Sequence, residues 1–348
     1  MTGGSTATLF SFGTYLYEVN KVAQVKSKSE FRFHVYFFLI NWIYAKRMEG
    51  KHLKLLTLQD GQLGVKVDEG IIVVDKALQA VPEAGLTADI MDVISSGKEG
   101  LEKLESYIKR LDLTDADFLL DEKDVAWGPA VSRPRKIICV GLNYRKHADE
   151  TKAKYPEIPI IFNKFDNALT GHLTGIKVPR TTERLDHEVE LGIVMGQTGK
   201  YIQKEEALDY VFGYCTTNDI SARDIQKRTP QWMAGKTNDG FAPVGPYIVT
   251  KDEIPNPNQL QVKTTVNGEE RQNSNTSDMI FSCEDLIAYI SKHMTLYPGD
   301  LIMTGTPEGV ILGKPMEERV YLQPGDKMTV EVEHLGALTN YLIADDGK

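Results

Sequence analysis

The chain has 348 residues, and its 40 lysines and arginines against 49 aspartates and glutamates give a formal net charge of −9. The length provides for one large domain or two smaller ones, and 41% hydrophobic with 26% charged residues is typical of a soluble globular protein. Such an acidic chain is a poor partner for nucleic acid or an anionic membrane surface, so we expect neither. Three widely spaced cysteines, Cys139, Cys215 and Cys283, provide no disulfide framework and no Cys-x-x-Cys metal pair, which favours a cytoplasmic location.

Residues 1–50 differ in composition from the rest. They contain 11 of the 30 aromatic residues and carry a net charge of +3, so the remaining 298 residues carry −12. The apolar run Phe31–Ala45 is interrupted by Arg32 and His34, and it is shorter than the ~20 residues of a membrane-spanning helix. The features of a secretory signal are also missing. We interpret residues 1–50 as a poorly ordered extension or the product of an upstream start codon, with a membrane-surface helix as the alternative.

The pattern becomes regular from residue 53 and predicts a small domain of strands and helices over 53–120. Acidic-Gly pairs, which favour tight hairpins, separate short β-rich runs at 53–58, 63–67 and 71–74. Helical spacing of apolar residues follows over 88–111 and is interrupted by Ser95-Ser96-Gly97. We assign no chemistry to this region.

The body from residue 137 onward reads as mostly β. Apolar runs predict strands at 137–140, 160–162, 188–195, 210–218, 244–249, 261–266, 301–304 and 327–332. Short helices are expected at 145–150 and 283–293. Because strands outnumber helices and hairpin signals are frequent, we expect an α+β fold that is mainly β, rather than alternating βα units.

The strongest local motif is the run Asp186–Val194. Side chains alternate faces along a strand, so Glu188 and Glu190 lie on one face and the intervening apolar residues on the other. Two neighbouring carboxylates repel unless a cation lies between them. The alternative interpretation is a solvent-facing acidic edge.

Asp219 follows the end of the next expected strand, 210–218, and adds a third carboxylate. Two glutamates on one strand and an aspartate at the end of another form a hard oxygen ligand set, which suits Mg²⁺ or Mn²⁺ and suits Zn²⁺ poorly. A second interpretation makes Asp219 only the N-cap of a helix that begins at Ile220.

His147 and Glu150 are three residues apart, so a helix places them on one face. A carboxylate beside an imidazole raises its basicity and fixes its tautomer, as a water-activating base requires. Arg223, Gln226 and Lys236 follow Asp219 in a polar stretch and either clamp a substrate carboxylate or remain solvated.

The segment Thr304–Gly309 ends a strand with a Gly-rich turn that offers N–H and hydroxyl groups to an anion. It has no P-loop lysine, and the chain has neither a Gly-x-Ser-x-Gly elbow nor a Cys/His nucleophile pattern. A hydrolytic reaction would therefore use activated water.

Taken together and in this order, these motifs resemble the fumarylacetoacetate hydrolase superfamily over about residues 134–342. One such motif is weak evidence, whereas seven in register are highly specific. The motifs are Gly141–Tyr144 leading to His147 and Glu150, Ile161–Lys164, Asp186–Gly192, Asn218–Asp224, Lys236, Met294–Asp300 and Thr304–Pro307.

The resemblance implies a β-roll catalytic domain over residues 134–345, preceded by the small β-rich domain and assembled as a homodimer. It implies Mg²⁺ or Mn²⁺ held by Glu188, Glu190 and Asp219. It implies that His147 and Glu150 activate water from a lid-like helix and that Lys236 is the active-site lysine. The residues implied in substrate binding are Arg223, Gln226, Thr306 and Lys164.

A small 2-oxo acid that chelates the ion would form a stabilised enolate as a C–C bond breaks. We predict a hydrolase or lyase that cleaves acylpyruvate- or fumarylpyruvate-type substrates or decarboxylates a β-keto acid. One alternative is isomerase or decarboxylase activity in aromatic catabolism, and another is a non-catalytic metal-binding protein. Phe165–Leu169 and Pro230–Met233 depart from the family pattern. The resemblance therefore does not assign the residues of the pocket that holds the far end of the substrate.

Overall fold

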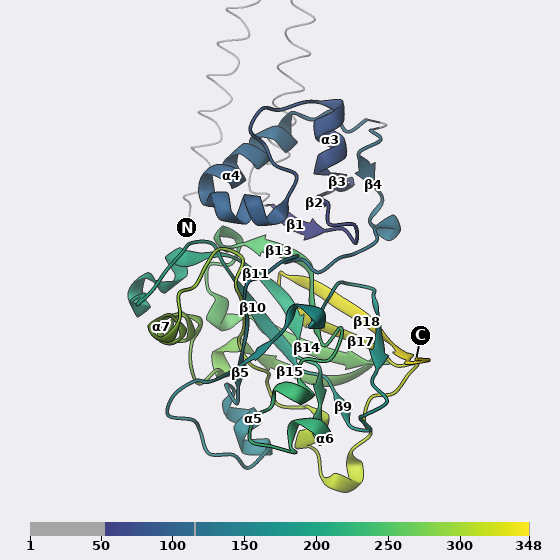
Figure 1. The fold of residues 1–348 in the computed structure, drawn as a ribbon, viewed down its shortest axis with the longest axis vertical. Helices are drawn as coiled ribbons and strands as arrows, with labels where there is room; N and C mark the ends of the chain where they lie inside the picture. Colours follow the sequence, from purple (N-terminus) through teal and green to yellow (C-terminus); the bar gives the residue numbers. More distant parts are fainter. Residues whose placement is uncertain (1–52, 115, 348) are drawn as a thin grey trace, which may run out of the picture. The chain divides into compact units, whose positions relative to one another are not determined.

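The computed structural model describes residues 53–114 and 116–347. The interpretation of residues 1–50 lies outside this range. The described chain is α+β and mainly β, as expected, with one large sheet, a five-stranded sheet and a minor two-stranded ribbon (Figure 1). No helix in the described part of the chain is long and apolar enough to span a bilayer.

The large sheet has the strand order β4-β3-β2-β1-β13-β11-β10-β16-β5-β6, with β7 beside β13. Its first strands are β1 (Lys54–Thr57), β2 (Leu63–Val67), β3 (Gly70–Val73) and β4 (Leu119–Leu120). The others are β5 (Ile137–Gly141), β6 (Ile160–Lys164), β7 (Leu169–Thr170), β10 (Val189–Met195), β11 (Val211–Asn218), β13 (Ala242–Thr250) and β16 (Leu301–Met303). The expected strands at these positions are thus confirmed to within a few residues.

Two helices, α3 (Val74–Ala80) and α4 (Ile90–Arg110), pack their apolar residues against β1, β2 and β3. The Asp89 side chain caps α4 by accepting a hydrogen bond from the Met91 N–H at 2.8 Å. Gly97 interrupts α4 with a φ of +56°, where the sequence predicted a break. The apolar run 71–74 did not reveal α3, because its helix-forming residues follow that run.

Strand β1 pairs antiparallel with β13, so the strands of residues 53–120 continue the sheet that carries the body of the protein. The division into a domain at 53–120 and a catalytic domain at 134–345 stays a prediction.

The five-stranded sheet has the order β15-β14-β17-β18-β8. Its strands are β8 (Gly175–Val178), β14 (Gln261–Val266), β15 (Glu269–Asn275), β17 (Lys327–Val332) and β18 (Gly336–Ala344). The sequence predicted β14 and β17 but not β15, whose residues are all polar. Pairing with β14 along its length supplies the hydrogen bonds that hold this strand extended.

The site is positioned by the ends of β5 and β16, which pair in parallel and finish at the same edge of the sheet. Asn143 joins the two following loops, since its Nδ2 donates to the Thr304 carbonyl at 2.8 Å and to the Phe281 carbonyl at 3.1 Å. Two short helices border the site: α5 (Arg145–Glu150), which follows β5, and α6 (Arg223–Gln226), which follows strand β12 (Ser221–Ala222) of the two-stranded ribbon. The remaining helix and the other ribbon strand are α7 (Cys283–His293) and β9 (Leu185–Asp186).

Candidate active site

Three carboxylates meet at the start of β10 and the end of β11. One oxygen from each of Glu188, Glu190 and Asp219 lies within 4.8 Å of those of the other two. Val189 and Leu191 alternate with the glutamates and are anchored in the core, so the strand period aims Glu188 and Glu190 together. The three carboxylates therefore lie close together, as the sequence predicted.

Two alternative interpretations of these residues are wrong. Glu188 and Glu190 are 5% and 1% exposed, so they do not form a solvent-facing acidic edge. Asp219 does not cap a helix at Ile220, because residues 221–222 form β12 and α6 begins only at Arg223, with Ala222 at its N-cap. The Asp219 carboxylate is therefore free of backbone capping and is directed to the cluster.

Two lysines contact the carboxylate cluster. The Lys236 ammonium lies 2.6 Å from Glu188 Oε2 and 2.7 Å from Asp219 Oδ2. The Lys164 ammonium lies 2.7 Å from Asp219 Oδ1 and donates to the backbone carbonyls of Ile220, Lys236 and Phe241. Lys164 is thus a buried support behind Asp219, and the substrate contact implied for it stays a prediction.

The positive charge is unevenly shared. Burial would raise the pKa of Glu188, but Arg223 and Lys236 outweigh it and hold that pKa below its usual range. Burial would lower the pKa of Lys236, but Asp219 and Glu188 outweigh it and raise that pKa. Burial, Asp219 and Glu188 together raise the pKa of Glu190 well above its usual range. Of the three carboxylates, Glu190 is the one that forms no ion pair with the described residues.

The donor set fits a hard divalent ion. Among the described residues, the hydrogen-bond partner of the Glu190 carboxylate is the Gly305 N–H, which donates to Oε2 at 2.8 Å. Three buried carboxylates are the oxygen ligands that Mg²⁺ and Mn²⁺ prefer, and the charge near Glu190 is what such an ion would neutralise. The residues present therefore fit the metal that the sequence analysis expected.

His147 and Glu150 form a pair on α5. His147 Nδ1 lies 2.7 Å from Glu150 Oε1, and Glu150 Oε2 accepts the Gly309 N–H at 3.0 Å. The approach of Glu150 to Gly313 leaves no room for a side chain at residue 313. The imidazole is 6% exposed and oriented by this carboxylate, which leaves Nε2 for a ligand.

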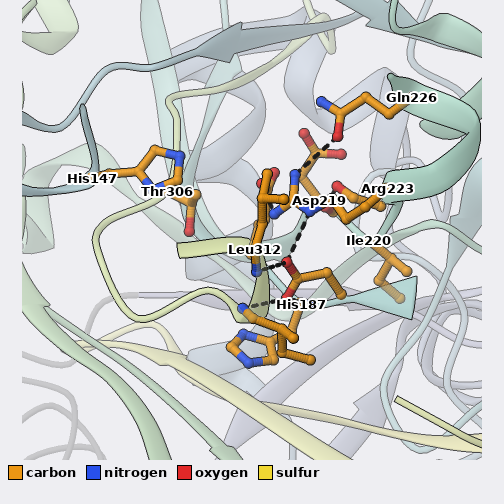
Figure 2. A network of polar contacts seen from close by, with 12 residues as sticks. His147, His187, Asp219, Ile220, Arg223, Gln226, Thr306 and Leu312 are labelled. Atoms are coloured by element: carbon orange, nitrogen blue, oxygen red, sulfur yellow. Dashed lines mark hydrogen bonds and ion pairs between the residues drawn. The ribbon is translucent and has the colours of Figure 1, made fainter. Parts of the chain in front are cut away.

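Arg223 is held by other protein groups. Its Nε donates to Asp186 Oδ2 at 2.8 Å, its Nη1 donates to Gln226 Oε1 at 3.1 Å, and its Nη2 lies 2.5 Å from Glu188 Oε1. Figure 2 shows the Arg223–Gln226 contact, with His147 and Thr306 on the opposite side of that view. The expected contact of Arg223 with a substrate carboxylate stays a prediction.

Asp186 belongs to the predicted motif Asp186–Val194, but the motif did not reveal its supporting role. Its carboxylate binds Arg223 and accepts the N–H groups of His187, Ile311 and Leu312 at 2.9, 2.9 and 3.0 Å. Asp186 is fully buried, and its hydrogen bonds connect the segment that leads into β10 with residues 311–312. Its position two residues before Glu188 was the available signal, but its role depends on a loop more than 120 residues away.

Replacing Asp186 with asparagine is expected to destabilise the protein by about 3–5 kcal/mol, because the buried Arg223 loses one of its two carboxylate partners. Chemical denaturation measures the change. The matched control is Asp224→Asn, since Asp224 is only partly buried and binds Thr182 and Glu183. Equal losses of stability in the two variants would contradict a special structural role for Asp186.

Gln272 is a second supporting residue that the sequence did not reveal, because it lies on the all-polar β15. Its Oε1 accepts the Val189 N–H and contacts His187 Nδ1, both at 3.1 Å. Its Nε2 donates to Thr306 Oγ1 at 2.9 Å. The Thr306 hydroxyl, acting as the acceptor here, keeps its own proton for a ligand.

One cavity of about 200 Å³ collects these groups. Eight of the ten predicted site residues line it, namely His147, Glu188, Glu190, Asp219, Arg223, Gln226, Lys236 and Thr306. Glu150 and Lys164 are not among the lining residues, but they contact the lining residues His147 and Asp219, respectively. Lys227 and Trp232 also line the cavity, although the sequence analysis gave neither a role. A small pocket with convergent charged groups of shifted pKa is typical of an enzyme acting on a small molecule.

Comparisons with known proteins agree with this class. The family model for the C-terminal domain of fumarylacetoacetate hydrolase matches residues 136–343. The chain belongs to the fumarylacetoacetate hydrolase family, as the sequence motifs indicated, and its relatives are named enzymes of that family. This chain is accordingly an enzyme.

Two curated relatives share a name. The mitochondrial oxaloacetate tautomerase Fahd2a of Rattus norvegicus is 44% identical over 65% of this chain and 72% of its own length. The mitochondrial oxaloacetate tautomerase fahd2 of Xenopus laevis is 38% identical over 81% of this chain and 86% of its own length.

Two solved structures share the fold. Fumarylacetoacetate hydrolase from Exiguobacterium antarcticum is 36% identical with a TM-score of 0.70, over 84% of this chain and all of that one. Maleylpyruvate hydrolase from Sphingobium sp. SYK-6, in complex with manganese(II) and pyruvate, is 29% identical with a TM-score of 0.68 over the same shares.

Proposed function

We propose that this enzyme catalyses the enolisation of a small 2-oxo dicarboxylate with a divalent metal ion, and that its reaction is the keto–enol tautomerisation of oxaloacetate. The observation that carries the proposal is the cavity of about 200 Å³ in which His147 faces three buried carboxylates. Its volume is below the ~300 Å³ at which drug-sized ligand sites begin, so it suits a short substrate. The names of the rat and Xenopus relatives support the same reaction.

Glu188, Glu190 and Asp219 would hold the ion. When bound, the ion supplies an electrophile for the 2-oxo oxygen and stabilises the negative charge of the enolate. Lys236 adds a fixed positive charge beside the same carboxylates, at 2.6 Å from Glu188 Oε2. The Thr306 hydroxyl, held by Gln272, donates to the substrate carboxylate.

His147 moves the proton. In the keto form the C3–H bond breaks and its proton passes to Nε2, while the C–H electron pair forms the C2=C3 bond and the 2-oxo oxygen takes the negative charge. Nε2 then returns the proton to that oxygen, so bonds and charges balance without an oxidant or a co-substrate. Glu150, at 2.7 Å from Nδ1, orients the ring and stabilises the imidazolium that forms. Burial of His147 keeps bulk water from competing for the proton.

The second candidate is the C–C bond hydrolysis predicted from the sequence. The same His147–Glu150 pair suits the activation of water, because the carboxylate holds the imidazole in a fixed orientation and tautomer. Maleylpyruvate hydrolase is a relative whose name describes such a reaction. Decarboxylation and isomerisation would pass through the same kind of enolate. They differ from each other in how the enolate forms and where it is protonated.

A substrate panel tests the proposal. The purified protein is mixed with oxaloacetate, acylpyruvates or maleylpyruvate, with Mg²⁺, with Mn²⁺ or with a chelator, and enol absorbance and product release are followed. We expect keto–enol interconversion to exceed the buffer rate with metal and return to that rate with chelator. Cleavage of an acylpyruvate without faster tautomerisation would overturn the proposal in favour of hydrolysis. Turnover of no substrate would overturn both.

Other expectations stay predictions. The homodimer is tested by sedimentation of the purified protein. The cytoplasmic location stays open to test by fractionation, and the two tautomerases are named as mitochondrial proteins. The expected role in aromatic catabolism and the expected absence of nucleic-acid and membrane partners also stay predictions.

A further inference from the structure

The cationic side chains of lysine and arginine that line the cavity differ in what they bind. Lys236 contacts Glu188 and Asp219, and Arg223 has protein partners on all three guanidinium nitrogens. Neither charge is free for a substrate without breaking an existing ion pair. Lys227 is the third such residue of the lining.

Lys227 has no carboxylate partner among the described residues. It follows α6, and its backbone N–H donates to the Arg223 carbonyl at 3.2 Å, so the backbone at this position is held by the helix end. Its side chain is exposed at the cavity and forms no ion pair or hydrogen bond with the described residues. A lysine in this situation is ready to bind an anion that enters the cavity.

The charges around Lys227 are positive. Partial desolvation and the guanidinium groups of Arg223, Arg319 and Arg184 lower its pKa. Within the described residues Arg319 and Arg184 form no ion pairs with carboxylates, and Arg319 Nε donates to the Lys314 carbonyl at 2.8 Å. The positive potential at this side of the cavity is therefore not neutralised by the protein.

Another part of the cavity lining is apolar. Phe162 and Trp232 meet edge to face, with ring centroids 5.6 Å apart, and the Trp232 ring lies so close to Gly141 that a side chain there would collide with it. Such a wall stabilises no charge, and the carboxylate cluster repels anions. Of the lysine, arginine, carboxylate and aromatic side chains of this lining, Lys227 is the one that favours a negatively charged substrate tail.

We infer that Lys227 binds the second carboxylate of the substrate and makes the enzyme selective for 2-oxo dicarboxylates over 2-oxo monocarboxylates. The inference rests on the proposed function in placing a 2-oxo acid in this cavity. Lys227 is a substrate-binding residue in this assignment, and the proton transfer stays with His147.

Binding measurements test the inference. Calorimetry with the Mg²⁺-loaded full chain compares oxaloacetate with pyruvate, which has the same 2-oxo acid head but no second carboxylate. We expect Lys227→Met to weaken oxaloacetate binding by a factor of about ten or more and to leave pyruvate binding unchanged, since only the charge-assisted contact is lost. Lys227→Arg should keep most of the selectivity. The matched control is Arg228→Met, which removes an exposed neighbouring charge outside the cavity lining.

The outcomes separate the inference from the proposed function. If Lys227→Met weakens both ligands equally, or Arg228→Met has the same effect, the inference is wrong. It is also wrong if the wild-type protein binds oxaloacetate no more tightly than pyruvate. If the wild-type protein binds oxaloacetate selectively through Lys227 but does not interconvert its keto and enol forms, the proposed function fails and the inference stands.

Discussion

Replacing Glu190 with glutamine is expected to abolish metal-dependent activity and to make the metal-free protein more stable. Glu190 lies beside Glu188 and Asp219 and forms no ion pair within residues 53–114 and 116–347, so neutralising it removes buried repulsion. Glutamine retains an oxygen that can accept the Gly305 N–H, and the side-chain volume is nearly unchanged. The same change removes one of three carboxylate ligands, so affinity for Mn²⁺ should fall steeply.

Unfolding with and without Mn²⁺ measures both effects. A metal that binds only the folded protein stabilises it by about 2.7 kcal/mol at 100 times its dissociation constant, and this gain should appear in the wild type and vanish in Glu190→Gln. Glu331→Gln is the control, because Glu331 is an exposed glutamate on β17. A variant at Glu190 that keeps the full metal-dependent gain would show that the ion is not held there.

Replacing His147 with glutamine is expected to lower kcat by about 10²–10⁴, the usual contribution of a positioned acid–base group. Affinity for Mn²⁺ should stay unchanged, because the imidazole is bound to Glu150 and is not one of the three clustered ligands. Glu150→Gln should lower kcat less, since the ring stays in place with a weaker partner.

Kinetics and metal titration on the same preparations separate these roles. His334→Gln is the control, because His334 has an exposed side chain on a turn. Loss of Mn²⁺ affinity in His147→Gln would contradict the assignment and make the imidazole a ligand. An unchanged kcat would exclude it from proton transfer.

Local patterns were sufficient for much of the fold. The acidic-Gly turns, the apolar runs and the break at Gly97 all lie where the sequence predicts them, because a hairpin or a helix interruption depends on a few neighbouring residues. Strand β15 was missed because its polar residues have no strand pattern, and only its pairing with β14 makes it a strand. Helix α3 was missed because an apolar run led into it.

The contacts of the site also fall into those that local spacing predicts and those that it does not. Strand alternation predicted that Glu188 and Glu190 share a face, and helical spacing predicted the contact of His147 with Glu150. Apart from the bond to the adjacent His187, the contacts described for Asp186 and Gln272 join residues 34 to 126 positions apart, so no local spacing predicts them. These contacts arise when strand β9 of the ribbon and strand β15 of the five-stranded sheet are brought to the site.

By itself, the sequence determined the kinds of side chain available and the elements that carry them: oxygen ligands on β10 and at the end of β11, and an imidazole with its carboxylate on α5. Only the tertiary structure decided how their charges are shared. In the part of the chain that the structure describes, Lys236 and Arg223 form ion pairs with the carboxylates, whereas Glu190 has no cationic partner and Lys227 has no anionic one. The physical reason is that a buried charge depends on every neighbour within a few ångströms, whereas spacing along the chain reports only those neighbours that belong to the same element.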